Sequence, residues 1–140
     1  METKYIGGPE GLKASIVGVG CNAFGKRIDE AATHAVIDAA LEAGINFFDT
    51  AETYGGGLSE EFIGNGLKGR RDEMVLATKF GHSHSNVEGK KKGSPENVKA
   101  TAEKALKALK TDRIDLFQQH RPDRETPVSE TLGALEDLVH

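Results

Sequence analysis

The chain has 140 residues, of which 37% are hydrophobic and 29% are charged, and its formal net charge is −4. This composition is typical of one folded domain and argues against a disordered or membrane-spanning chain, and a weakly acidic chain is not expected to bind nucleic acid or an anionic membrane. Its one cysteine and the lack of an apolar leader at residues 1–10 favour a reducing compartment, and we expect a cytoplasmic protein.

The first part of the chain alternates short apolar runs with a helix pattern. Residues 5–12 hold three glycines and a proline, which predict a small hairpin or an irregular cap. Residues 16–20 (IVGVG) predict a buried strand. The next helix is expected to begin after Asp29 as its N-cap and to end at Gly44, because alanines and a valine recur between them at helical spacing.

Two further strands and a second helix follow. Residues 45–50 (INFFDT) predict one strand, and residues 74–79 (MVLATK) predict the next. Between them we expect a helix that is capped by Ser59 and closed by Gly69. A polar loop at residues 81–93 comes after the second of these strands.

The last part of the chain repeats the pattern. Ser94 followed by Pro95 predicts a helix start, with the serine as the cap and the proline in the first helical position. Residues 114–119 (IDLFQQ) predict a strand, and Thr126 followed by Pro127 predicts a last helix. The apolar face of that helix is expected to comprise Val128, Leu132, Leu135 and Val139. Four strand-then-helix units in order predict an α/β fold with parallel strands, in a single domain of residues 1–140.

Ionisable side chains lie at the predicted ends of three consecutive strands. Asp49 ends the second strand of the four, Lys79 ends the third and His120 ends the fourth. Ligands of α/β folds bind at this edge of the sheet, where the carboxyl ends of parallel strands meet. Tyr54 follows Asp49 by five residues, so we expect it in the loop above the same edge.

These four residue types suit one reaction. A phenol ionises at about pH 10, which is too high for a good acid at neutral pH, but a lysine ammonium beside it stabilises the phenolate. A carboxylate keeps the lysine charged and oriented, and a histidine can hydrogen-bond the same substrate oxygen. The set predicts protonation of a carbonyl oxygen while hydride reaches the carbon. Each residue alone fits a cap, surface or loop position equally well, but their joint placement at matching strand ends favours a site.

Two other motifs have simpler explanations. Gly18, Gly20 and Ala23 fit a dinucleotide-binding G-x-G-x-x-A pattern, but the loop that follows and the late acid at the next strand end argue against a Rossmann fold. His82 and His84 lack a carboxylate or cysteine partner at ligand spacing, so we predict a solvated loop and no metal site.

The chain resembles the aldo-keto reductases from about residue 12 to residue 140. The matching stretches are GVGCNAFG, GINFFDTAETYGGGLSEEFIG, GRRDEMVLATKFG, GSPENVKATAEKALKALKTDRIDLFQQHRPD and TPVSETLGALEDLV. By this resemblance the catalytic tetrad of the family corresponds to Asp49, Tyr54, Lys79 and His120. The resemblance implies an oxidoreductase in which Tyr54 is the proton donor, with a small-molecule aldehyde or ketone as substrate and NADPH, or less often NADH, as cofactor.

The resemblance also implies a fold and a cofactor site. The fold of the family is the (β/α)8 TIM-type barrel, and the chain would supply a short hairpin and the first four β/α units, which is its N-terminal half. Gly20, Cys21 and Asn22, together with Asp49, lie where the family contacts the nicotinamide end of the cofactor. For the Cys21 side chain itself, a packing role is the default interpretation. The other half of the family's barrel supplies most of the remaining cofactor contacts.

Two functional hypotheses stay open at this point. A completed barrel would be a carbonyl-reducing enzyme. A half-barrel by itself leaves its first and fourth strands as open edges, so such a chain would self-associate and be catalytically silent. The helix pattern still continues at His140, which suits a fragment of a full reductase, and the sequence does not select a particular carbonyl substrate.

Overall fold

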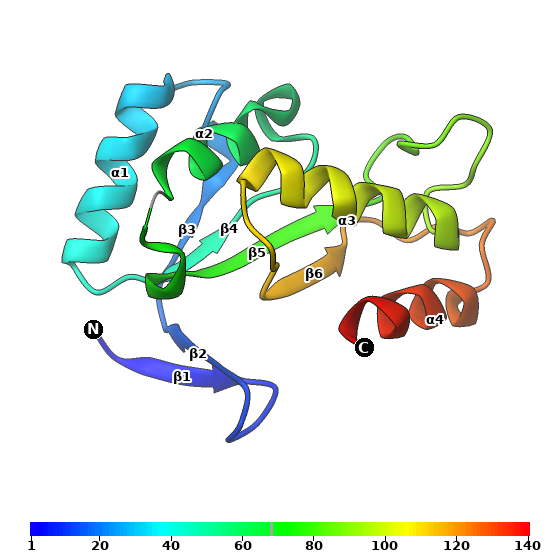
Figure 1. Ribbon diagram of the computed structural model, residues 1–140, viewed down its shortest axis with the longest axis horizontal. Helices are drawn as coiled ribbons and strands as arrows, with labels where there is room; N and C mark the ends of the chain where they lie inside the picture. The colour runs from blue at the N-terminus through cyan, green and yellow to red at the C-terminus, as the bar shows by residue number, and fades with distance from the viewer. Residues whose placement is uncertain (68) are drawn as a thin grey trace.

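An antiparallel hairpin precedes a four-stranded parallel sheet in the computed structural model, which describes residues 1–67 and 69–140 (Figure 1). The hairpin pairs β1 (Thr3–Ile6) with β2 (Leu12–Ser15). The sheet and its helices follow in chain order as β3 (Gly18–Gly20), α1 (Glu30–Glu42), β4 (Phe47–Asp49), α2 (Leu58–Gly66), β5 (Val75–Phe80), α3 (Pro95–Leu109), β6 (Leu116–Gln119) and α4 (Val128–Val139). Short 3-10 turns in the connections are η1 (Cys21–Ala23), η2 (Tyr54–Gly57) and η3 (Arg71–Glu73).

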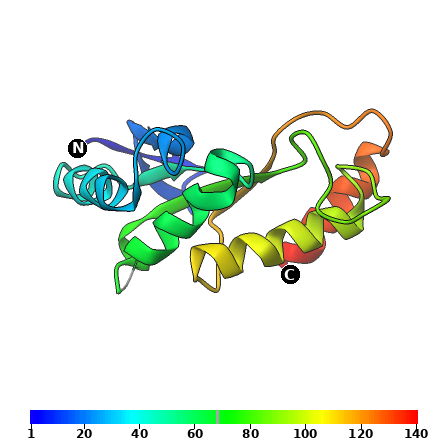
Figure 2. The same ribbon diagram turned by 90° about the horizontal axis from the view of Figure 1, so that it is seen from above.

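The sheet has the strand order β3-β4-β5-β6, and each neighbouring pair is parallel. A parallel sheet in sequential order requires each helix to cross back over the same face, and each helix here contacts the next one along the chain (Figure 2). The structure thus confirms the hairpin and the four predicted β/α units. Among the described residues, no helix combines the length and the apolar character that crossing a membrane requires.

Two of the predicted helix caps are present. Asp29 precedes α1, and its side chain accepts a hydrogen bond from the Ala32 amide at 2.9 Å. Ser94 plays the same part for α3 by accepting from the Asn97 amide at 3.3 Å, and Pro95 occupies the first helical position. Such residues mark where helices begin because they satisfy amides that have no partner inside the helix.

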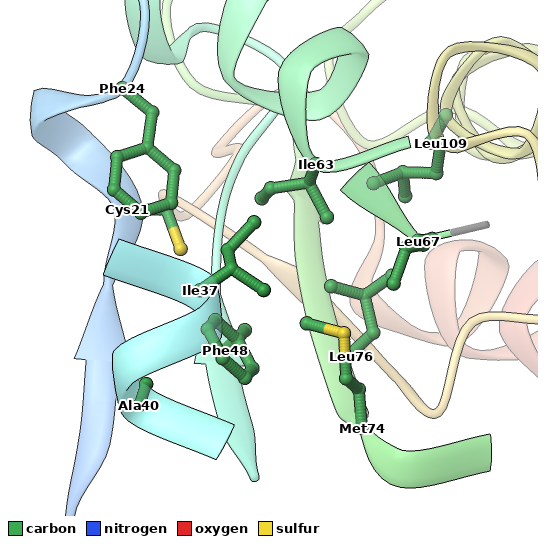
Figure 3. Packing of buried hydrophobic residues seen from close by; sticks show 11 residues of the cluster. Cys21, Phe24, Ile37, Ala40, Phe48, Ile63, Leu67, Met74, Leu76 and Leu109 are labelled. Atoms are coloured by element: carbon green, nitrogen blue, oxygen red, sulfur yellow. The ribbon is translucent and has the colours of Figure 1, made fainter. Parts of the chain in front are cut away.

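The main hydrophobic core lies between the sheet and helices α1, α2 and α3 (Figure 3). Phe48 and Leu76 stand opposite each other in β4 and β5 and are fully buried. Ile37, Ile63 and Leu109 pack against them from the three helices. Burying side chains of this size stabilises a fold by about 1.5–3 kcal/mol each, so this cluster fixes the helices on the sheet.

The first strand of the sheet is shorter and more exposed than predicted. β3 begins at Gly18, and Ile16 and Val17 before it are 52% and 49% exposed. The Ser15 hydroxyl donates to the Val17 carbonyl and the Ser15 amide donates to the Asn46 side chain, so hydrogen bonds at Ser15 hold the chain just before β3. The prediction of a strand is therefore confirmed for Gly18–Gly20, whereas its start at Ile16 and its burial are wrong.

Helix α2 begins differently from the prediction. Gly57, with a φ of +100°, precedes the helix, and Ser59 lies inside its first turn. The Ser59 hydroxyl donates to the Cys21 carbonyl instead of accepting from an amide of its own helix. The predicted N-cap at Ser59 is wrong, because a left-handed glycine turns the chain into the helix and leaves the serine to join two elements. The helix ends at Gly66, before the predicted stop at Gly69.

The apolar stripe predicted for the last helix is mostly exposed. Thr131 and Ala134 are the buried residues of α4, and Leu135 packs beside them against Phe80. The exposed members of the stripe are Val128, Leu132 and Val139. β6 is the last strand of the described sheet, so no further strand lies beside it for this stripe to cover.

Candidate active site

The carboxyl ends of β4, β5 and β6 bring together the four side chains that the sequence predicts there. Lys79 Nζ donates to Asp49 Oδ1 at 2.6 Å. The same nitrogen lies 5.0 Å from the centroid of the Tyr54 ring. The His120 ring meets the Tyr54 ring edge-on, with centroids 5.8 Å apart and an angle of 86° between the planes. A phenol, an ammonium, a carboxylate and an imidazole thus share one small region at the sheet edge.

Strand geometry sets the ion pair. Phe48 and Thr78 are fully buried on the helix side of the sheet, so their chain neighbours Asp49 and Lys79 face the opposite side. Asp49 stands opposite Ala77, two residues before Lys79 on the same face of β5. The long lysine side chain spans the remaining distance to the carboxylate.

Lys79 is a mostly buried cation with two acceptors. Its side chain is 12% exposed, and Nζ donates to the Thr50 carbonyl at 2.8 Å as well as to Asp49. The Asp49 side chain is 37% exposed and keeps contact with solvent. Buried charges are stable when they are paired and hydrogen-bonded, so these contacts fix the ammonium beside the Tyr54 ring.

Three consecutive glycines place Tyr54 above the sheet edge. Gly55, Gly56 and Gly57 have φ values of +60°, +69° and +100°, a run that residues with a side chain rarely adopt. A Cβ at Gly55 would lie 2.5 Å from the Phe24 carbonyl oxygen, so the turn also has no room for one. The glycine run lets the chain reverse within η2 and enter α2 while the Tyr54 ring stays over the site.

The first turn of α2 ties three strand ends together behind the site. The Ser59 hydroxyl donates to the Cys21 carbonyl after β3 at 3.1 Å and lies 2.8 Å from the Thr50 hydroxyl after β4. The next residue, Glu60, accepts from the Thr78 hydroxyl of β5 at 2.5 Å. Thr50 and Thr78 are chain neighbours of the site aspartate and the site lysine. The hydrogen bonds of Ser59 and Glu60 therefore fix the distance between β4 and β5, the strands that carry Asp49 and Lys79.

Glu60 makes the stability of the fold depend on pH. Burial raises the pKa of its carboxyl group above the ordinary value of 4.5, and the nearby Glu52 carboxylate adds to the rise, although the Thr78 hydrogen bond and Lys104 oppose it. The folded chain therefore binds a proton at Glu60 at pH values where the unfolded chain has lost it. By linkage, the free energy of unfolding falls as pH rises from the unfolded pKa to the raised folded pKa.

We expect Glu60→Gln to remove this loss, because glutamine is neutral at both pH values and can still accept from Thr78. Urea unfolding at mildly acidic and at neutral pH should show the variant gaining stability relative to the parent chain as pH rises. Glu61→Gln is the matched control, since Glu61 is exposed on the same helix turn and the change in net charge is the same. A stability difference that is equal at both pH values would contradict this account of Glu60.

The loop at residues 81–93 carries a fifth side chain to the site. The ring centroids of His82 and His120 are 4.6 Å apart, with an angle of 59° between the planes. His82 is half-buried, so the prediction that it lies in a solvated loop is wrong, whereas His84 is exposed. The sequence does hold a signal for His82: it lies three residues after Lys79, just beyond the end of the same strand. Within residues 1–67 and 69–140, no three or more His, Cys, Asp or Glu side chains are arranged to hold a metal ion.

Side chains on two sides anchor this loop. Asn97, fully buried in α3, accepts hydrogen bonds from the Ser85 hydroxyl and from the Asn86 amide. The Asn86 side chain donates to the Glu52 carboxylate, after β4, and to the Thr101 hydroxyl of α3. The loop is therefore joined both to the helix layer and to the segment between Asp49 and Tyr54.

His120 lies in surroundings that disfavour its charged form. Burial is the main cause that lowers its pKa below the ordinary 6.5. The positive charges of His82, Lys79 and Arg121 lower the pKa further, and Glu52 opposes them. The Nδ1 atom of His120 is buried and has no hydrogen-bond partner among the described residues. The neutral imidazole is thus the form that this site accommodates.

The residues that the sequence predicts at the cofactor differ in their exposure to solvent. Gly20 is exposed at the end of β3, opposite Asp49, and a Cβ built on it would meet no atom within 4 Å. Asn22 is exposed as well. The backbone at Gly20 is therefore open beside Asp49. Cys21 is fully buried in the core, and burial raises the pKa of its thiol to about 12, so its side chain packs and does not offer a cofactor contact.

Comparison with known proteins adds to this geometry. Residues 16–140 match the model of the Aldo/keto reductase family. The chain is 40% identical over 138 residues to "Probable aldo-keto reductase 1" of Glycine max and 38% identical over 134 residues to aldo-keto reductase YhdN of Bacillus subtilis. These alignments cover 94% and 91% of this chain but 40% of each relative, so the chain spans less than half the length of the curated relatives it matches.

A solved structure of an aldo-keto reductase from Bacillus halodurans, in its holo form, resembles the chain with a TM-score of 0.86 and 38% sequence identity. The similarity covers 99% of this chain and 46% of that chain. The fold is therefore a partial (β/α)8 barrel, as the sequence predicts.

Proposed function

The chain belongs to the aldo/keto reductase family, and on that basis we propose that its site serves the reduction of aldehydes or ketones to alcohols with NADPH or NADH as the hydride donor. One observation carries the proposal. The Lys79 ammonium joins the Asp49 carboxylate, at 2.6 Å, to the face of the Tyr54 ring, 5.0 Å from its centroid. Family membership supports an oxidoreductase, and this arrangement adds the acid that carbonyl reduction requires.

Tyr54 is the proton donor in this proposal. As negative charge builds on the carbonyl oxygen, the phenol transfers its proton, and the Lys79 ammonium stabilises the phenolate that forms. Asp49 and the Thr50 carbonyl hold the ammonium in place before the reaction starts. A charge that is already oriented does not have to reorganise as the transition state forms, which is why such groups lower a barrier effectively.

His120 orients the substrate. Its ring stands edge-on to the Tyr54 ring, so a carbonyl oxygen that accepts from the phenol also lies near the imidazole. A second donor on the same oxygen fixes its position relative to the phenol. It also adds hydrogen-bond stabilisation where charge develops.

The surface over Gly20 is where the nicotinamide ring would lie, beside Asp49 and Asn22. When bound, the reduced nicotinamide supplies the hydride that adds to the carbonyl carbon and is itself oxidised. Gly20 permits close approach because it has no side chain, and the Asn22 amide offers hydrogen bonds to a polar ring substituent. The proton from Tyr54 completes the alcohol, so one hydride and one proton are added across the carbonyl.

The function is tested in a completed barrel, made by joining residues 1–140 to the part of the Bacillus subtilis relative that this chain does not match. We expect this protein to oxidise NADPH or NADH when a simple aldehyde is added, which is followed by loss of nicotinamide absorbance. A folded barrel that oxidises neither cofactor with any of a panel of aldehydes and ketones would contradict the proposal.

Replacing Lys79 with methionine in the completed barrel is expected to slow carbonyl reduction and to move the alkaline limb of its pH profile upward. The physical reason is the loss of the ammonium 5.0 Å from the Tyr54 ring, which no longer stabilises the phenolate. The isolated chain offers a direct readout, because it has two tyrosines and no tryptophan. Tyr5→Phe leaves Tyr54 as its sole phenol, whose ionisation can be followed by near-ultraviolet absorbance.

The control for this variant is Lys107→Met, which removes an exposed lysine from α3 with the same change in net charge. It should leave both the pH profile and the phenol titration as they were. A folded Lys79→Met protein whose Tyr54 titrates at an unchanged pH would show that the lysine is not coupled to the phenol.

We also propose a second state, for residues 1–140 by themselves: a catalytically silent half-barrel that self-associates. The observation that favours it is the apolar surface at the two ends of the sheet. Beside β3 this surface comprises Ile16 and Val17, and on α4 it comprises Val128, Leu132 and Val139. Soluble proteins rarely expose large apolar patches, so these apolar side chains favour contact with a second copy of the chain.

A further inference from the structure

We propose that His82 is a positioning residue of this site: it keeps His120 neutral, with its one ring proton on Nε2, so that His120 can donate a hydrogen bond to the substrate oxygen. The inference rests on the proposed function for the identity of that oxygen. The charge state of His120, which His82 is inferred to control, can be measured in the absence of any substrate.

His82 is held against the His120 ring. Gly81 before it has a φ of +73°, and a Cβ there would lie 3.2 Å from a backbone carbonyl oxygen at the far end of the loop, so this turn requires glycine. The His82 amide donates to Glu52 Oε1 at 3.4 Å. Farther along the loop, the Asn86 side chain donates to the same carboxylate. These contacts fix the backbone on both sides of His82, so the ring contact of 4.6 Å is part of the built site.

The buried face of His120 determines where its proton lies. Nδ1 has no hydrogen-bond partner among the described residues and is shielded from solvent. A proton on Nδ1 would be a buried donor without an acceptor, which is costly. A neutral ring with its proton on Nε2 leaves Nδ1 as an acceptor without a partner, which costs less than the unpaired donor of a charged ring, because the charged ring also loses the hydration of its positive charge. Nε2 is then the hydrogen-bond donor of the neutral ring.

The charges around His120 favour the same state. The titratable and charged groups that face it are Lys79, His82, Arg121, Glu52 and Tyr54. The three basic groups oppose a positive charge on the ring, Glu52 favours one, and the phenol is uncharged while it remains a proton donor. His82 lies against the ring, and of the three basic groups its charge opposes a positive charge on His120 most strongly.

A neutral His120 matters for the proposed reaction because it leaves a single acid at the site. A charged imidazole would compete with Tyr54 for the role of proton donor and would be repelled by the Lys79 ammonium. By keeping the ring neutral, His82 separates the two roles: Tyr54 gives up a proton, and His120 holds the oxygen in place.

The test is a titration of the histidine ring resonances of residues 1–140 by NMR, with five histidines to follow and His120→Gln to assign the one of interest. In the parent chain the two rings are in contact at a tilt of 59°, so a positive charge on one of them disfavours a positive charge on the other. We expect His82→Phe, which keeps a flat ring but cannot be charged, to raise the midpoint of His120 by about half to one pH unit, the size of the coupling between charges at this separation.

Two further variants make the result decisive. His82→Gln should raise the His120 midpoint in the same direction, so a failure of the phenylalanine variant to fold does not remove the test. His84→Phe, the exposed histidine of the same loop, should leave the midpoint unchanged. A His120 midpoint that stays the same in folded His82→Phe and His82→Gln chains would overturn the proposal, and so would an equal shift in His84→Phe.

Failure of this inference is distinct from failure of the proposed function. In the completed barrel, His82→Phe should move the acid limb of the kcat/KM profile upward by the same amount as the NMR midpoint. Suppose that the barrel reduces aldehydes, but that His82→Phe changes neither the acid limb of its kcat/KM profile nor the NMR midpoint of His120. That result would contradict the inference alone. A barrel without activity, in which the His120 midpoint still shifts, contradicts the proposed function and leaves the charge coupling in place.

Discussion

Tyr54→Phe is expected to lower the rate of carbonyl reduction by the completed barrel by about 10²–10⁴-fold, which is the usual cost of losing a general acid. The phenyl ring keeps the contact with Lys79 and the edge-on contact with His120, so the shape of the site should persist. Only the transferable proton is lost. Cofactor affinity should therefore stay nearly the same, and the loss should be found in kcat.

Tyr5→Phe is the matched control for this variant. Tyr5 lies exposed in the hairpin strand β1, and the chemical change is the same loss of one hydroxyl group. The rate of reduction and the affinity for NADPH, followed by its fluorescence, are compared in both variants. A Tyr54→Phe enzyme that turns over within about tenfold of the parent would show that another group donates the proton.

The part of the site that the sequence predicts well is the part that strand ends determine. Asp49, Lys79 and His120 each follow an apolar run, and parallel strands in sequential order bring their carboxyl ends to one edge. Once the strands are recognised, the meeting of these side chains follows from the topology. Tyr54 is harder to place from sequence, because its position depends on a left-handed glycine turn.

Which partners some residues contact depends on distant segments and does not follow from local patterns, even where the position of the residue relative to a strand end does. His82 reaches His120 because the loop after β5 is anchored through Asn86 to Glu52, a pair separated by 34 residues. Ser59 looks like a helix cap in sequence, but it bonds Cys21, 38 residues away. Local patterns describe which residues could cap or line an element, whereas these contacts exist only after the layers have packed.

The edges of the sheet explain the remaining errors. A run such as IVGVG predicts a buried strand only if strands lie on both sides of it, and β3 has a neighbour on one side. The stripe on α4 likewise predicts a core face, but β6 is the last strand of the described sheet. The spacing of apolar residues shows which face of a strand or helix is suited to burial. At the β3 edge and on α4, the described part of the barrel has no further element to cover that face.

Residues 1–140 by themselves are therefore expected to bind NADPH weakly and to reduce aldehydes negligibly compared with the completed barrel. The acid side of the site lies on β4, β5 and β6, so it is present in this chain. Hydride transfer also needs the donor carbon at about 3–3.5 Å from the carbonyl carbon, and such positioning supplies about 7–11 kcal/mol of a barrier reduction. The chain spans 46% of the solved relative, so we expect much of the surface that would position the cofactor to come from the rest of a barrel.

The same chain is expected to sediment as a dimer or a larger species. Ile16 and Val17 at the β3 edge and Leu132 on α4 are exposed apolar side chains that pairing would cover, and open strand edges add unpaired backbone groups. Leu132→Lys should shift the population toward monomer in analytical ultracentrifugation. Ser129→Lys, exposed on the same helix and equal in charge change, should not.

Self-association should not restore activity, because a second copy brings the same half of the barrel. Two such halves repeat Tyr54 and Lys79 but add no new surface for the phosphate end of the cofactor. Sedimentation combined with a fluorescence titration of NADPH separates the cases. A stable monomer of residues 1–140 that binds NADPH at micromolar concentration and turns over aldehydes rapidly would contradict both expectations, since four β/α units would then position the cofactor without the rest of a barrel.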